Sequence, residues 1–153
     1  MENEGVTYIN GFLRALSCGC HDCDYVPFYD AESFEFSENS FTKSLEHHFY
    51  AKEPVRLRRQ SKPSVSNFQL VKDEWKAVLS KLLIKWIDSK LSMNQVFADL
   101  YKDDLFELIE DVVGKEPLCF IANIEHDTME LCNDTFGFAG EGKAFYLQFS
   151  FSD

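Results

Sequence analysis

The chain has 153 residues, and 26 acidic residues against 15 basic ones give a net charge of −11. This length suits one domain with a hydrophobic core and is too short for two, so we expect residues 1–153 to form a single domain. The negative charge argues against binding nucleic acid through bulk electrostatics, because an acidic surface repels the phosphate backbone.

The sequence also argues against a secreted or membrane-spanning protein. Its apolar runs are too short to cross a bilayer, and its first residues lack the basic and apolar regions of a secretory signal. Five cysteines are an odd number, whereas a secreted disulfide framework pairs its cysteines. We therefore expect a cytoplasmic location.

The first third of the chain predicts two short helices. Apolar residues recur at helical spacing through 7–16, and Phe41, Leu45 and Phe49 fall on one face of a second helix at 40–51. Between them, Phe34 and Phe36 alternate with polar residues, which indicates a short strand or an extended loop. Residues 52–63 then carry five of the fifteen basic residues and form either an edge strand or an exposed loop.

The central third predicts a helical hairpin or three helices. Ser66 with Gln69, and Ser92 with Gln95, have the spacing of a capping box, and each pair precedes a wide apolar stripe. The second stripe contains a break around 102–104. It ends at Gly114, which suits a residue just past a helix C-terminus.

After Pro117 the apolar period changes from that of a helix to that of a strand. Residues 118–125, 128–132 and 143–151 predict strands, and the glycines of 137–142 predict a hairpin loop. The fold class is therefore α+β: a mostly helical first two-thirds followed by a C-terminal antiparallel β-sheet packed against the helices. A strand from 32–37 or 54–58 could join that sheet.

Three cysteines within six residues, Cys18, Cys20 and Cys23, form the one cluster that suggests a metal. Short cysteine spacings supply zinc ligands, and the fourth ligand would come from a distant histidine or cysteine. Asp22 and Asp24 weaken this interpretation, because neighbouring carboxylates disfavour the thiolate form. We expect reduced thiols and no cofactor. A zinc-binding structural or regulatory domain is the alternative.

No catalytic motif is present. The sequence has no nucleophile elbow, no zinc-protease motif and no phosphate-binding loop, and its glycine-rich segment joins predicted strands instead of opening a helix. We therefore expect a protein that is not an enzyme.

Two groups of carboxylates suggest a surface that binds a partner. No basic residue lies between Arg14 and Lys43, where aromatic and acidic residues alternate, and a second acidic group follows one face of the last predicted helix. Such a surface would attract a basic partner, although a solvated helix face has the same pattern. The partner-binding candidates are Asp22, Asp24, Asp30, Glu32, Glu35, Asp103, Asp104, Glu107, Glu110 and Asp111.

In size, acidity and α+β pattern the chain resembles the bacterial immunity proteins of contact-dependent growth inhibition systems, which neutralise toxins. The resemblance implies a cytoplasmic inhibitor that binds a basic toxin domain, most often a nuclease. Its carboxylates would occlude the toxin's active site by charge and by bulk. The oligomeric state stays open.

Overall fold

The computed structural model describes residues 3–18, 26–37, 40–52, 63–72, 74–88, 95–125 and 132–152. Its elements, in chain order, are α1 (Glu4–Cys18), β1 (Val26–Ser33), α2 (Phe41–Lys52), β2 (Ser64–Leu70), α3 (Trp75–Leu83), the π-helical turn η1 (Ile84–Asp88), α4 (Gln95–Val113), β3 (Leu118–Glu125), β4 (Cys132–Gly140) and β5 (Lys143–Ser152). This confirms the α+β class.

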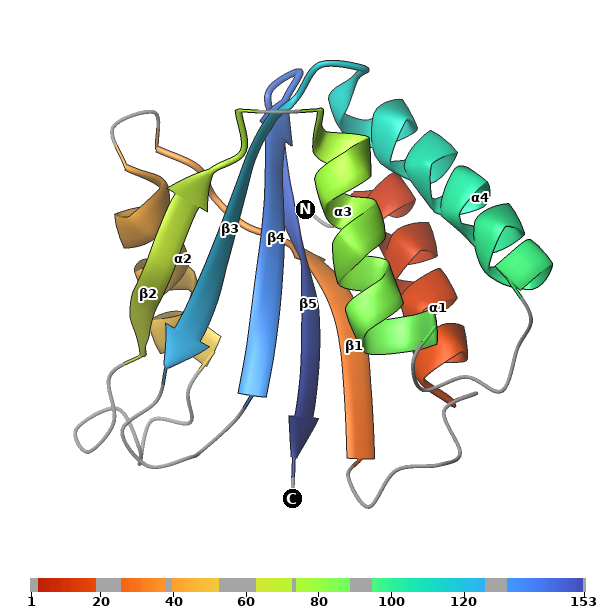
Figure 1. Cartoon of the computed structure of the whole chain (residues 1–153). Helices are drawn as coiled ribbons and strands as arrows, with labels where there is room; N and C mark the ends of the chain where they lie inside the picture. The colour runs from red at the N-terminus through yellow and green to blue at the C-terminus, as the bar shows by residue number, and fades with distance from the viewer. Residues whose placement is uncertain are drawn as a thin grey trace.

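The described strands form one five-stranded antiparallel sheet in the order β1-β5-β4-β3-β2 (Figure 1). The prediction of a mostly helical first two-thirds followed by a C-terminal sheet is wrong, because β1 and β2 come from the first seventy residues and form the two edges of the sheet. β1 pairs with β5 over its whole length, from Val26↔Ser152 to Ser33↔Phe145. Helices and strands therefore interleave along the chain.

Helices cover both faces of the sheet. α1, α3 and α4 lie on one face, which we call the three-helix face, and α2 lies on the other, the α2 face (Figure 1). The alternation predicted for β5 is confirmed: Phe145, Leu147 and Phe149 enter the core of the three-helix face, whereas Tyr146 enters the core beneath α2. β5 thus contributes side chains to the cores on both faces of the sheet.

The helices predicted at 7–16 and 40–51 are confirmed as α1 and α2, but the helix start predicted at Ser66 is wrong. Residues 64–70 form β2, and the next helix begins at Trp75. The Ser66 hydroxyl donates to Glu125 on β3 (2.9 Å) instead of capping a helix. Asn67 has a left-handed backbone (φ 52°) within a β-bulge, and this extra residue disrupts the alternation that would have indicated a strand.

The last predicted helix is confirmed as α4, without the expected break at 102–104. Gly114 ends it with φ 84°, and its N–H donates to the Glu110 carbonyl (2.8 Å). This is the left-handed terminus that the sequence predicted.

The hairpin loop predicted at 137–142 is much shorter than expected. Gly137 and Gly140 lie within β4, and the turn consists of Glu141 and Gly142, both with positive φ (54° and 75°). A two-residue turn of this kind suits the twist of an antiparallel hairpin. Gly137 is a glycine because the Phe120 ring occupies the place of its side chain, where a Cβ would lie 1.9 Å from Phe120 Cζ.

The strands predicted at 118–125 and 143–151 are confirmed as β3 and β5. The extended segment predicted around Phe34 and Phe36 lies just after β1, which ends at Ser33. The strand options at 54–58, and residues 128–131 of the strand predicted at 128–132, lie outside the described residues.

Candidate functional site

Strand β1 presents acidic side chains to one face of the sheet and core side chains to the other. Asp30 and Glu32 point to the α2 face, whereas Tyr29 and Ala31 pack against the three-helix face. We therefore describe the candidate site around β1, as a polar cluster on one side and a groove beside α1 on the other.

Four side chains from three elements meet beneath α2, and we call them the β1 cluster: Glu32, His48, Lys52 and Tyr146. The Glu32 carboxylate atom Oε2 accepts hydrogen bonds from Lys52 Nζ (2.5 Å) and from the Tyr146 hydroxyl (2.9 Å). His48 Nε2 lies 3.2 Å from the same hydroxyl and 3.6 Å from Oε2. His48 and Lys52 are four residues apart on α2, so one helix face supplies both.

The β1 cluster fixes the protonation states of Glu32 and Tyr146. The nearby His48 ring, with the hydrogen bonds from Lys52 and Tyr146, lowers the pKa of Glu32 to about 2, against the opposing effect of burial. Burial and the nearby carboxylates of Glu32 and Asp30 raise the pKa of Tyr146 far above its ordinary value. Glu32 is therefore an anion and Tyr146 a neutral donor at any physiological pH, an arrangement that ties α2 to β1 and β5.

Asp30 lies beside this cluster, and one oxygen of its carboxyl group has no hydrogen-bond donor among the described residues. Its side chain is 8% exposed, and its Oδ1 has no hydrogen-bond partner among the described residues. Burial raises the pKa of Asp30 to about 6, although Lys52, Arg14 and His48 act in the opposite direction. Asp30 therefore exchanges a proton near neutral pH.

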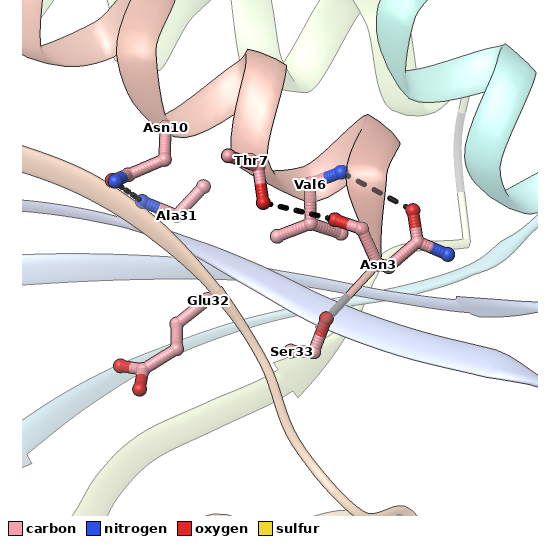
Figure 2. A pocket seen from close by; sticks show the side chains of 7 residues that line it. All are labelled: Asn3, Val6, Thr7, Asn10, Ala31, Glu32 and Ser33. Carbon is pink, nitrogen blue, oxygen red and sulfur yellow. Dashed lines mark hydrogen bonds between the residues drawn. The ribbon is translucent and has the colours of Figure 1, made fainter. Parts of the chain in front are cut away.

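A groove of about 260 Å³ lies between the first turns of α1 and the outer edge of β1 (Figure 2). Asn10 bridges it, because its Oδ1 accepts the Ala31 N–H (3.0 Å). At the start of α1, Asn3 Oδ1 accepts the Gly5 and Val6 N–H groups. Figure 2 also shows the Glu32 carboxylate pointing away from the side chains of Asn3 and Asn10, so it belongs to the cluster beneath α2.

Four of the five acidic residues predicted on the last helix lie in one exposed row on α4. We call this row the α4 strip: Asp103, Asp104, Glu107 and Asp111, all exposed. Glu110, the fifth predicted member, is half-buried and pairs with Lys76 of α3. The α4 strip belongs to a helix of the three-helix face, whereas Asp30 and Glu32 point to the α2 face. The structure therefore does not bring the two predicted acidic groups together.

The other predicted site residues are only partly described. Glu35 is exposed in the segment after β1, whereas Asp22, Asp24, Cys20 and Cys23 lie outside the described residues. Cys18 is the last residue of α1, and its side chain is not described. Within the described part of the chain, no three histidine, cysteine or acidic side chains are placed to share a metal ion.

Sequence reasoning missed the partners of Glu32. His48 could have been found from its place on the predicted helix 40–51, and Lys52 would share its face if that helix continued by one residue. Tyr146 could not, because its contact with Glu32 spans 114 residues and depends on the pairing of β1 with β5.

No protein-family model and no curated protein matches the sequence. Among solved structures, the crystal structure of citrus MAF1 is similar over 99% of this chain and 98% of that one, with a TM-score of 0.53 and 13% sequence identity. This chain has a MAF1-like fold. At this identity the likeness establishes the fold and assigns no role to any residue.

The MAF1-like fold corrects the expected identity. The resemblance to an immunity protein, the basic toxin as partner and the setting of bacterial contact-dependent growth inhibition are all wrong, because the whole chain matches the fold of citrus MAF1. Size, acidity and an α+β pattern suggested the wrong class because many unrelated proteins share them. Separately, no described helix has the length and apolar character needed to cross a bilayer.

Proposed function

We propose that this chain is a non-enzymatic regulator that acts by binding another protein, and that its partners belong to the RNA polymerase III machinery. The observation that carries the proposal is the MAF1-like fold over 99% of the chain, since MAF1 is a repressor of RNA polymerase III. Such a regulator works in the nucleus and the cytoplasm.

The β1 cluster supports a structural role for its residues over a catalytic one. Glu32 uses Oε2 to hold Lys52 and Tyr146, and these bonds fasten α2 to the sheet. A general acid or base needs a pKa near the working pH. The pKa of Glu32 is lowered to about 2 and that of Tyr146 is strongly raised, so both are poorly suited to proton transfer.

The α4 strip is the surface that we propose for the partner. Its four carboxylates are exposed, and Asp103, Glu107 and Asp111 are spaced four residues apart. Like charges at this spacing cost a few tenths of a kcal/mol each in a helix. A basic surface on the partner would turn that cost into attraction and would also speed the encounter.

The test measures binding and transcription together. Purified RNA polymerase III, with its initiation factors, transcribes a short gene in the presence of increasing amounts of the chain, and binding is measured in parallel on the immobilised chain. We expect binding and a dose-dependent loss of transcript, while transcription by RNA polymerase II stays unchanged. Absence of both binding and repression would contradict the proposed function.

A charge-matched pair of variants tests the surface. The first replaces Asp103, Asp104 and Asp111 with asparagine and Glu107 with glutamine. The control replaces four exposed glutamates elsewhere with glutamine, at Glu74, Glu116, Glu125 and Glu141. Both variants lose four negative charges, so a weakening of about tenfold or more in the first alone would locate the contact on α4. Equal weakening in both would show that only the net charge matters.

A further inference from the structure

The open sheet has two edges, and each carries main-chain groups that another strand could pair with. β1 and β2 are the edge strands. Unpaired N–H and C=O groups at such edges are a template for strand addition by a second chain. Whether a second chain can add to the sheet therefore depends on what covers the outward N–H and C=O groups of β1 and β2.

The outer edge of β1 is occupied by α1. The Phe34 N–H donates to the Ala144 carbonyl of β5 (3.1 Å). The main-chain N–H and C=O groups of even-numbered residues in β1 therefore point towards β5, and those of odd-numbered residues point outward. Of these, Pro27 has no N–H, and the Ala31 N–H donates to Asn10 Oδ1 on α1 (3.0 Å). Figure 2 shows this contact at the groove between helix and strand.

The outer edge of β2 is occupied in the same way by α2. The Val65 N–H donates to Glu46 Oε1 (3.3 Å), whereas its cross-strand neighbour is Ile124 of β3. Two residues further along, Asn67 forms the bulge with φ 52° and donates from Nδ2 to Asn123 Oδ1 (2.9 Å). A bulge twists an edge away from the flat geometry that strand pairing needs.

We propose that Asn10 and Glu46 are edge guards, whose side-chain oxygens take the place of an incoming strand's carbonyl and so prevent a second copy of the chain from extending the sheet. The two guards come from different helices and protect opposite edges. The blocked contact at β2 is an antiparallel pairing of two β2 strands about a twofold axis. This inference is independent of the proposed function.

The test compares variants that remove the acceptor with variants that keep it. Glu46→Ala removes the oxygen that faces Val65, and Glu46→Gln keeps one. Asn10→Ala and Asn10→Asp form the matching pair for β1. Sedimentation velocity over a concentration series measures self-association, and amide hydrogen exchange followed by NMR reports on Val65 and Ala31. Thermal melts show which variants are folded.

We expect Glu46→Ala to self-associate at a concentration at least about tenfold below that of the wild type, and the Val65 amide of its monomer to exchange about tenfold faster. Glu46→Gln should behave as the wild type. The proposal would be overturned if both acceptor-removing variants stayed monomeric, or if the wild type already paired through β2. If Glu46→Ala failed to fold, Asn10→Ala and the Ala31 amide would decide the matter.

Discussion

Asp30 is a buried residue through which pH acts on the stability of this fold. Its pKa is raised from 3.8 to about 6 by burial, so the folded state binds the proton more tightly than the unfolded state does. The free energy of unfolding should therefore rise as the pH falls through 6 towards 4. The difference between these pKa values corresponds to at most about 3 kcal/mol.

Asp30→Asn removes this titration. We expect the variant to be about 1–3 kcal/mol more stable than the wild type at pH 7.5, because an amide carries no buried charge, and to differ much less at pH 5. Urea unfolding at the two pH values measures the difference. If the variant exceeded the wild type in free energy of unfolding by the same amount at both pH values, ionisation of Asp30 would not destabilise the fold.

Gly137 and Gly11 make a matched pair for testing close packing. A Cβ at Gly137 would meet the Phe120 ring, whereas a Cβ at Gly11 of α1 has no atom within 4 Å. We expect Gly137→Ala to lower the free energy of unfolding by about 1–3 kcal/mol or more, because the Phe120 ring must move out of its buried position. Gly11→Ala should raise it by up to about 1 kcal/mol through helix propensity. Chemical denaturation of both variants checks this, and equal effects would contradict the packing argument.

At the scale of elements, the β1 cluster predicts how α2 is held. Glu32→Gln removes the charge that pairs with Lys52 and His48, so we expect amides of α2 to exchange severalfold faster while α4 stays unchanged. Hydrogen–deuterium exchange by mass spectrometry measures this. Glu35→Gln, exposed three residues further on, serves as the control. Unchanged exchange in α2 would mean that its other contacts, such as the burial of Leu45 and Phe49, hold it without the Glu32 charge.

Local pattern predicted most helices and strands of this fold but not the elements with an irregular backbone. α1, α2, α4, β3 and β5 have clear periodicity and were predicted. β2 was missed because the bulge at Asn67 adds a residue to its alternation. Half of β4 was mistaken for a loop because Gly137 leaves room for Phe120, a residue of another strand. In both cases tertiary contacts decide the conformation.

The candidate site was predictable only where its contacts are local. The α4 strip follows from spacing on one helix. The β1 cluster could not be predicted in this way, because Tyr146 reaches Glu32 only through the pairing of β1 with β5. No local sequence pattern indicates that pairing. The guards Asn10 and Glu46 are equally invisible in sequence, since each accepts from the main chain of a different element.

At the scale of the whole molecule, a net charge of −11 predicts association that depends strongly on salt. If the α4 strip contacts a basic partner, the association rate should fall about tenfold or more between low and high salt. The variant of the α4 strip should show a weaker dependence on salt than its charge-matched control. Stopped-flow mixing measures the rates, and a rate that does not vary with salt would contradict electrostatic attraction.

The place of β5 in the sheet has a consequence for how this protein is made. β5 is the last of the described strands in the chain, yet it lies between β1 and β4. A ribosome delivers β1 more than a hundred residues before the strand that pairs with it. Until then β1 has no neighbour in the sheet, and such distant pairings form slowly. The nascent chain must therefore keep its first strand from aggregating until nearly all of the described fold has been translated.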